Sequence, residues 1–314
     1  MKTIAPVAPF LVWLCAVLLT AEAARAELTP AGILADMQRV ADWQPTNGPD
    51  KGPHGWVEAV ADAGYSALAG ISGEARYRDQ LRAQSEKNQW LLRGLLYHAD
   101  DHCVGQMYAE LYQIYREPRM LDTMRQHFDY VLTHPSGVTN LSMAQPHAFV
   151  QKRWSWCDAL FMAPPAWLRL WAVTGAKEYR DFAMTNFWAT SEYLYDRDEH
   201  LYYRDSRYFT MQEANGKKVF WSRGNGWVLA GMARMLEYLP NNDPDRPRLE
   251  AHFREMAGRI LSLQQPDGSW HSSLLDPDSF PTPEASGTGL DTFALAWGVN
   301  AGLLDRAKIG RAHV

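Results

Sequence analysis

The chain has 314 residues, of which 46% are hydrophobic and 21% are charged, a composition typical of a globular protein with a sizeable core. The formal net charge is −5 at pH 7 and no block of basic residues occurs, which argues against a nucleic-acid-binding protein. The chain also contains 13 tryptophans and 14 tyrosines, a surplus that both large helical cores and carbohydrate sites use.

The first 26 residues have the pattern of an export signal. Lys2 is followed by an apolar run, Phe10–Leu19, and then by Ala24-Arg25-Ala26, which fits an A-x-A cleavage site. The run is too short to span a bilayer. We therefore expect cleavage near Ala26, a mature protein that is periplasmic or secreted, and no membrane attachment after cleavage.

Two cysteines, Cys103 and Cys157, follow the predicted signal. An exported protein can form a disulfide, but both residues lie in apolar helical stretches, so a bridge and two free thiols both stay open. No CxxC or HExxH spacing occurs, so the sequence predicts neither a metal site nor another cofactor.

After residue 27 the hydrophobic pattern repeats with the period of an α-helix, and the alternation typical of β-strands is nearly absent. The pattern predicts one all-α domain over residues 27–307. The expected helices are Leu28–Asp42, Trp56–Ala69, Glu74–Leu95, His102–Tyr115, Pro118–Thr133, Ala163–Thr174, Lys177–Leu194, Trp227–Tyr238, Pro247–Leu263 and Leu290–Leu303.

An internal repeat indicates how these helices are joined. Ser72–Asp79 (SGEARYRD) matches Thr174–Asp181 (TGAKEYRD), and Tyr115–Asp122 (YREPRMLD) is a looser third copy. Each copy is a tight turn between two helices, so the repeating unit is a helical hairpin. Ten helices in five hairpins predict a ring of helix pairs in which an inner set alternates with an outer set.

The connections into the helices at His102, Ala163, Trp227 and Leu290 are longer, or richer in polar and aromatic residues, than the repeat turns. If alternate helices of a ring run parallel, these four N-termini open at the same end. Functional residues collect on such loops, and aligned helix N-termini favour an anionic ligand. We therefore expect the functional site at that end.

The connection Trp221–Gly226 runs directly into the expected helix Trp227–Tyr238. An apolar stripe from Val228 to Leu236 predicts that this helix packs into the core, with Arg234 and Glu237 off the buried face.

Within the connection, Arg223 and Asn225 form a polar pair flanked by Trp221 and Trp227. Two intervening glycines allow a close backbone approach or a positive φ. The pair predicts a substrate contact between aromatic side chains. The alternative is a helix cap at Asn225 beside two core tryptophans.

The connection Arg153–Pro165 contains Asp158 among aromatic residues. The Pro164-Pro165 pair is tolerated only in the first turn of a helix, so Asp158 lies just upstream of a helix N-terminus. Neighbours such as Trp156 and Phe161 solvate a carboxylate poorly, which favours its protonated form and suits a general acid. The alternative is that Asp158 only caps the helix.

Two further connections carry polar residues that the same site could use. Asp100-Asp101 precedes a helix and is either an ordinary cap or a second carboxylate for the site. The last connection, Asp267–Gly289, is polar and glycine-rich and includes Glu284, Ser286 and Thr288.

Together these stretches resemble glycoside hydrolase family 105, the unsaturated rhamnogalacturonyl hydrolases, and the related family 88 unsaturated glucuronyl hydrolases. The specific motifs are Trp156-Cys-Asp158-Ala-Leu-Phe-Met-Ala-Pro164 and Trp221-Ser-Arg-Gly-Asn-Gly-Trp227, and the weaker ones are Asp101-His102 and Glu284-Ala-Ser-Gly-Thr288. The resemblance covers roughly Trp56–Asp305 and implies an (α/α)6 barrel.

The resemblance also implies a reaction. The substrates of the family are short oligosaccharides left by polysaccharide lyases, which end in an anionic 4,5-unsaturated uronic acid. Asp158 would match the acid that protonates carbon 4 of the enol ether, after which water, deprotonated by the same carboxylate, adds at carbon 5. The resulting hemiketal opens and releases the remaining sugar, so the carboxylate spacing of ordinary glycosidases does not apply.

Other residues receive roles from the same resemblance. Asp101 would match the second family aspartate, which hydrogen-bonds ring hydroxyls. Arg204 stands near the place of a family histidine and could bind the carboxylate as a fork, which leaves the preference for the leaving sugar open. The remaining expected substrate-binding residues are Trp156, Trp221, Arg223, Asn225, Trp227, Ser286 and Thr288.

The last seven residues, Lys308–Val314, fit no helical pattern and look like a translated sequencing adapter. We expect a non-native tail after residue 307 and a barrel that lacks its last helix pair, since five hairpins are predicted where the family has six. The alternative is an ordinary frayed terminus.

Two other functions stay open at this point. One is another enzyme on the same barrel, either an ordinary uronidase or a polysaccharide lyase with Tyr203 or Tyr208 as its base. The other is a non-catalytic glycan-binding protein, although binding alone needs no buried acid. The parent polysaccharide and the oligomeric state do not follow from the sequence.

Overall fold

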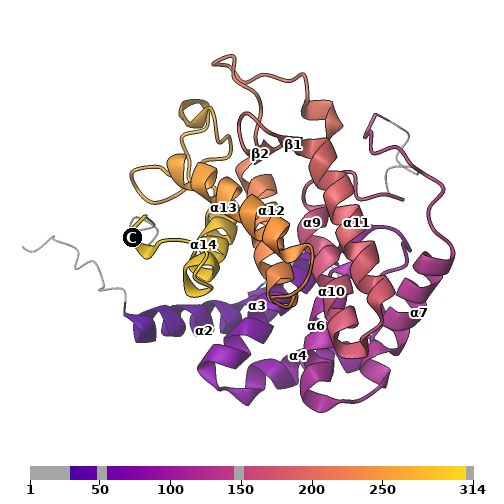
Figure 1. Ribbon diagram of the computed structural model, residues 1–314. Coiled ribbons are helices and arrows are strands. Elements are labelled where there is room, and N and C mark those ends of the chain that lie inside the picture. Colours follow the sequence, from indigo (N-terminus) through magenta and orange to yellow (C-terminus); the bar gives the residue numbers. More distant parts are fainter. Residues whose placement is uncertain (1–28, 48–54, 145–151, 309–314) are drawn as a thin grey trace, which may run out of the picture. The chain divides into compact units, whose positions relative to one another are not determined.

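The computed structural model describes residues 29–47, 55–144 and 152–308. The predicted export signal and the predicted tail from residue 309 onward lie outside these described residues. The named secondary-structure elements of the described residues are helices and one short antiparallel pair, β1 (Tyr195–Asp196) and β2 (Leu201–Tyr202), in which Tyr195 faces Tyr202 (Figure 1). The predicted all-α class is confirmed.

The chain divides into two units, residues 1–47 and 48–314. Of the first unit the structure describes α2 (Pro30–Asn47), none of whose residues is buried.

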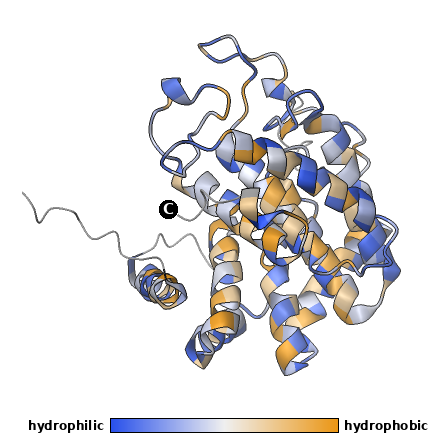
Figure 2. Ribbon diagram, turned by 60° about the vertical axis from the view of Figure 1, so that its left-hand side comes forward, coloured by the Kyte–Doolittle hydropathy of each residue, from blue (hydrophilic) through white to orange (hydrophobic). Residues whose placement is uncertain are grey.

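The second unit is built from helices of one to about five turns, joined by short turns and by longer loops (Figure 1). Figure 2 shows hydrophobic residues along these helices and hydrophilic residues along many of the connecting loops. The α-helices are α3 (Trp56–Ser72), α4 (Ala75–Lys87), α5 (Ala99–His102), α6 (Gly105–Tyr115), α7 (Arg119–Thr133), α9 (Ala159–Met162), α10 (Pro164–Thr174), α11 (Lys177–Leu194), α12 (Ser222–Leu236), α13 (Arg246–Ser262) and α14 (Ala285–Asn300). The 3₁₀ turns are η1 (Ser206–Tyr208), η2 (Pro277–Ser279) and η3 (Arg306–Lys308).

Four of the five predicted hairpins are present among the described residues. The helical hairpins are α3–α4, α6–α7, α10–α11 and α12–α13, and the first helices of these hairpins contact one another in the order α3, α6, α10, α12, with α14 next to α12. This row is the inner layer, and the second helix of each hairpin lies outside it. The arrangement agrees with a barrel of helical hairpins.

The three repeat copies are confirmed as tight helix-ending turns. Gly73 and Gly175 close α3 and α10 with φ of 70° and 75°, and Arg116 closes α6 with φ of 58°. Glycine takes this left-handed conformation without strain, whereas Arg116 is one of the few non-glycine residues that adopt it here. The third copy is therefore looser in sequence but equivalent in backbone geometry.

The long helix α12 is almost entirely buried: 14 of its 15 residues are buried and Arg223 is the exception. The prediction that Arg234 lies off the buried face is wrong, because it is only 7% exposed. Its charge is tolerated there because Glu110 of α6 pairs with it at 2.9 Å.

Four predicted helix boundaries are wrong by five residues or more. One is the end of α2, which lies at Asn47 rather than Asp42. The helix α4 ends at Lys87 rather than Leu95, because Gln89 and Trp90 take left-handed conformations with φ of 55° and 57°. The helices α12 and α14 begin five residues earlier than expected, at Ser222 and Ala285.

Gly224 and Gly226 are consequently helical, so they do not use the positive φ that glycine allows, but the predicted close backbone approach is confirmed. Their use is space. A Cβ on Gly224 would lie 2.9 Å from Sγ of Cys157, and one on Gly226 would lie 3.0 Å from Cβ of Leu290. The absence of side chains therefore lets α12 approach both the Asp158 loop and α14.

Cys103 and Cys157 are buried free thiols, so the structure favours the reading without a bridge. Across the described ranges, no helix combines the length and the hydropathy needed to cross a bilayer.

Candidate active site

Loops that are far apart in the sequence meet above the inner helices. Asp158, which immediately precedes α9, is close enough to Arg204 and Arg223 for both guanidinium groups to favour its ionised form. Asp158 in turn acts on Asp100 of α5, and Arg223 donates to Glu284 at the start of α14 at 3.1 Å. The predicted convergence of the loops that lead into the inner helices is therefore observed.

Arg204 is fixed beside Asp158 by its backbone and by a buried acid. The N–H of Cys157 donates to the carbonyl of Arg204 at 2.9 Å, and Trp156 forms a β-bridge with Asp205. Asp205, which is fully buried, accepts a hydrogen bond from the Arg204 guanidinium. The side chain of Arg204 nevertheless keeps 32% of its surface exposed, so it can still reach a ligand.

Asp158 has the surroundings expected of a general acid. It occupies the cap position of α9, yet its side chain makes no capping hydrogen bond, so the capping alternative is not supported. The residue is partly exposed and accepts from the thiol of Cys157 at 3.2 Å. Burial raises the pKa of Asp158, while the thiol hydrogen bond, Arg204 and Arg223 oppose that rise.

The second carboxylate at this site is Asp100, whereas the sequence favoured Asp101. Asp101 is 2% exposed and accepts a hydrogen bond from the N–H of Leu95 at 2.8 Å. Burial, together with the charges of Asp158 and Asp101, raises the pKa of Asp100 to about 7. Two adjacent aspartates on one helical turn point in directions about 100° apart, and the sequence carries no signal that selects between them.

A cavity of about 430 Å³ opens beside this group. The guanidinium of Arg223 lies 4.2 Å from the ring centroid of Trp221 and donates to Ser286 at 3.3 Å. The cavity wall thus combines two guanidinium groups, aromatic rings and hydroxyls, which suits an anionic sugar. The lining residues are Arg204, Tyr208, Glu213, Val219, Trp221, Arg223, Ser272, Ser273 and Phe280.

Sequence reasoning did not identify Phe280 or Ser272 as parts of this wall. Phe280 follows η2, is 46% exposed and offers an apolar face to the cavity. Both residues lie in irregular loops outside any motif, and no spacing signal marks them.

Several predicted sugar contacts lie inside the protein. Trp227 is 4% exposed and packs against Phe161 and Trp56, with ring centroids 4.8 and 6.2 Å apart. Trp156 is 8% exposed and packs against His98 at 5.0 Å. These two tryptophans therefore belong to the packed core beneath the site and not to its exposed surface.

Asn225 does not fit the predicted substrate contact. It is fully buried and accepts from the N–H of Tyr202 at 2.7 Å. Its amide donates to the carbonyls of Tyr202 and Trp221, both at 3.0 Å. The alternative of a cap at Asn225 does not fit either, because the cap position of α12 is Trp221. Asn225 ties β2 to the start of α12.

The two hydroxyl residues of α14 differ from each other. Ser286 is exposed next to Arg223, in a position to reach a ligand. Thr288 accepts from the N–H of Trp270 at 3.0 Å, so its hydroxyl holds the preceding loop. Among the described residues no cluster of histidine, cysteine and acidic side chains could hold a metal ion.

Residues 29–313 match the family model described as Glycosyl Hydrolase Family 88. An unsaturated 3S-rhamnoglycuronyl hydrolase from Alteromonas sp. (strain LOR) is 37% identical over 259 residues, which cover 79% of this chain and 62% of that protein. A protein of the same description from Formosa agariphila is 39% identical over 265 residues, covering 82% of this chain and 70% of the relative. The chain thus spans less than two thirds of the Alteromonas protein.

Solved structures agree with this match. A structure described as a polysaccharide lyase is 28% identical with a TM-score of 0.79, covering 90% of this chain and 82% of its own. A family 88 glycosyl hydrolase from Bacteroides vulgatus is 28% identical with a TM-score of 0.78, covering 90% and 84%. A family 105 glycoside hydrolase from C. acetobutylicum is 19% identical with a TM-score of 0.71, covering 90% of this chain and 81% of its own. It shares the fold. The chain therefore belongs to glycosyl hydrolase family 88, as its resemblance to families 105 and 88 predicted.

Proposed function

We propose that this protein hydrolyses short oligosaccharides that end in a 4,5-unsaturated uronic acid and releases that terminal residue. The observation that carries the proposal is a poorly solvated carboxyl group, Asp158, whose two guanidinium neighbours, Arg204 and Arg223, line a cavity with aromatic walls. The descriptions of the Alteromonas and Formosa relatives, as unsaturated 3S-rhamnoglycuronyl hydrolases, support the same substrate class.

In this mechanism Asp158 acts from its protonated form, which burial favours by raising its pKa. It donates the proton to carbon 4 of the enol ether, and positive charge develops at carbon 5 and the ring oxygen. The carboxylate left behind then takes a proton from water while the water oxygen bonds to carbon 5. That proton returns Asp158 to its protonated form. The hemiketal then opens by breaking the bond between carbon 5 and the ring oxygen, which gives a ketone at carbon 5 and a hemiacetal at carbon 1. The hemiacetal breaks its bond to the leaving sugar, which departs with a hydroxyl group.

Asp100 completes the carboxyl pair. Because the pKa of Asp100 lies near 7, this carboxyl can hydrogen-bond a ring hydroxyl as donor or acceptor at neutral pH. The charge of Asp158 in turn discourages ionisation of Asp100, since two carboxylates in one poorly solvated site repel each other.

Arg204 and Arg223 would bind the uronate carboxylate. Each guanidinium has one acidic partner, Asp205 and Glu284 respectively, that fixes its position. Both keep exposed surface, with 32% and 38% of the side chain accessible. Preorganised arginines lose less conformational freedom on binding, which favours recognition of a small anion.

The test is turnover of an unsaturated disaccharide, followed by the loss of the double-bond absorbance in the ultraviolet. We expect wild-type turnover and a loss of about 10²- to 10⁴-fold in kcat for Asp158→Asn, because general acid catalysis contributes on that scale. Asp122→Asn, at an exposed position on the outer helix α7, is the control and is expected to leave kcat unchanged. Full activity of Asp158→Asn would remove the proposed acid.

A polysaccharide lyase is the second candidate, because a structure of that description is among the similar proteins. Tyr203 is a poor base for it, since burial and its hydrogen bond to Asp196 raise the pKa of this phenol well above its usual range. Tyr208 lines the cavity and is the better candidate base. New double bonds formed from a saturated polysaccharide would favour the lyase, and sugar affinity without turnover would favour a binding protein.

We also propose that the protein acts in the periplasm or outside the cell. The pattern of residues 1–26 supports export. Expression in a bacterial host with cell fractionation tests this, and a protein that stays in the cytoplasm with residues 1–26 attached would contradict it.

A further inference from the structure

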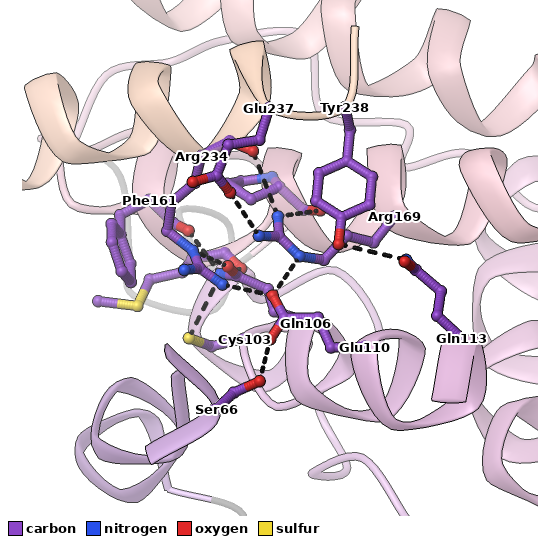
Figure 3. A network of polar contacts seen from close by, with 12 residues as sticks. Ser66, Cys103, Gln106, Glu110, Gln113, Phe161, Arg169, Arg234, Glu237 and Tyr238 are labelled. Atoms are coloured by element: carbon purple, nitrogen blue, oxygen red, sulfur yellow. Dashed lines mark hydrogen bonds and ion pairs between the residues drawn. The ribbon is translucent and has the colours of Figure 1, made fainter. Parts of the chain in front are cut away.

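A buried polar network lies among the inner helices, on the path from α6 to α9 and α12 (Figure 3). Its central members are Gln106 and Glu110 of α6, Arg169 of α10 and Arg234 of α12. Gln106 and Arg169 are each 1% exposed, and Arg234 is 7% exposed. The proposed mechanism gives these residues no role, although burying so many polar groups is costly unless their geometry is well satisfied.

The amide of Gln106 has one orientation in this network. Nε of Arg234 donates to Oε1 of Gln106 at 2.7 Å, and an arginine nitrogen can only donate. Nε2 of Gln106 therefore faces the opposite way and donates to the carbonyl of Phe161 at 2.9 Å and, more weakly, to that of Met162 at 3.4 Å. These carbonyls are the last ones of α9.

Arg234 is itself held by a permanent negative charge. Glu110 accepts from Arg234 at 2.9 Å, from Arg169 at 2.7 Å and from Ser66 of α3 at 2.6 Å. Burial raises the pKa of Glu110, but the two arginines outweigh it and bring that pKa to about 2. Glu110 is therefore ionised at neutral pH.

The helix α9 depends on such contacts because it has only four residues, Ala159–Met162. A single helical turn has almost no stability of its own. On one side α9 packs against Gly231 of α12, where a Cβ would lie 2.5 Å from the carbonyl oxygen of Leu160. On the other side the amide of Gln106 holds its C-terminal carbonyls, and Asp158 is the residue immediately before its first turn.

We propose that Gln106, oriented by Arg234, is a positioning residue that sets the location of Asp158 through the carbonyls of α9. The inference rests on the proposed function, because it assigns the network to the alignment of the proposed acid. Loss of the amide frees the end of α9 and lets Asp158 move relative to Arg204 and to the substrate.

The test compares Gln106→Met with Asp243→Asn. Methionine has nearly the volume of glutamine but cannot link Arg234 to α9. Asp243 accepts from Arg180 at 3.0 Å in the loop that follows α12, so its substitution weakens a buried ion pair without touching α9. Arg234→Lys is the second variant, because lysine keeps the positive charge near Glu110 but lacks the planar Nε donor that orients Gln106.

We expect Gln106→Met and Arg234→Lys to lower kcat by about 10- to 100-fold, with KM changed less than about threefold, since small misplacements of a reacting group cost rate more than affinity. The alkaline limb of the pH profile should also move to lower pH, because a displaced Asp158 is better solvated. Asp243→Asn should lower the melting temperature while keeping kcat and the profile. Wild-type kcat and pH profile in both network variants would overturn the proposal.

Hydrogen exchange gives a readout that does not depend on turnover. Amides in the segment 157–163 should exchange faster in Gln106→Met than in the wild type. Their exchange rates should be unchanged in Asp243→Asn. If the wild type fails to cleave the unsaturated disaccharide, the proposed function is refuted, and this exchange measurement alone decides the structural link. Equal exchange in Gln106→Met and the wild type would refute the link even if the enzyme is active.

Discussion

The close contact between α9 and α12 can be tested by adding one carbon atom. Gly231 has no side chain, and a Cβ there would lie 2.5 Å from the carbonyl oxygen of Leu160 and 3.0 Å from Cα of Phe161. Both opposing atoms belong to the backbone, so no rotation of a side chain relieves the overlap. Gly231→Ala must push the two helices apart or move α9.

The size of the movement follows from these distances. A Cβ essentially never approaches another heavy atom closer than 3.0 Å and rarely closer than 3.4 Å, so the 2.5 Å contact requires a shift of at least 0.5 Å (3.0 − 2.5) and more comfortably 0.9 Å (3.4 − 2.5). Overpacking of this kind costs about 1–3 kcal/mol, partly offset by up to about 1 kcal/mol from replacing a glycine in a helix by alanine. A displacement near 1 Å at the reacting group costs on the order of 10- to 100-fold in rate.

We therefore expect Gly231→Ala to lose more activity than stability. Melting temperature and kcat on an unsaturated disaccharide are measured side by side. Gly258→Ala is the matched control, because Gly258 lies on an exposed part of α13 and an added Cβ there meets nothing within 4 Å. The control should keep kcat and gain about 0.5–1 kcal/mol of stability.

Wild-type kcat in Gly231→Ala would refute the reasoning, because it would mean that α9 can yield without displacing Asp158. A fall in stability of several kcal/mol with an unchanged rate would place Gly231 in the core packing alone. Equal losses of activity in both alanine variants would show that the assay responds to something other than the contact with α9.

Three further predictions follow from buried polar groups. Burial raises the pKa of Asp62 from 3.8 to about 7, so the unfolded chain releases this proton at lower pH than the folded protein and wild-type stability falls from pH 4 to pH 7. Asp62→Asn should remove that fall. The free energy of unfolding of the variant relative to the wild type, measured in urea, should therefore increase by about 3 kcal/mol from pH 4 to pH 7. A difference that does not change with pH would contradict the assignment. Asn225→Ala should lower the free energy of unfolding by about 2–4 kcal/mol in the same assay, since it removes three hydrogen bonds and leaves the buried N–H of Tyr202 without its acceptor. A decrease below about 0.5 kcal/mol would contradict the role of Asn225 in linking β2 to α12. Asp100→Ala should lower kcat at least about tenfold with little effect on melting temperature. Asp101→Ala should lower the melting temperature with little effect on kcat, because it removes the acceptor of a backbone N–H. The opposite pattern would restore Asp101 as the second carboxylate.

The sequence by itself determined the helical class and the hairpin unit. Hydrophobic periodicity depends only on residues three and four apart, and a glycine such as Gly73 or Gly175 at a repeat turn meets a local demand for a left-handed conformation. The motifs around Asp158 and Arg223 were likewise legible, because each is a continuous stretch with an unusual density of aromatic and charged residues.

Only the tertiary structure decided which side chains face the shared cavity. It places Asp100 rather than Asp101 beside Asp158, turns Asn225 inward, and buries Arg234 against α6. These outcomes depend on how far each helix is rotated and how deeply it sits against partners that are distant in the sequence. Local periodicity fixes which residues share a face of one helix, but packing between helices determines what that face meets.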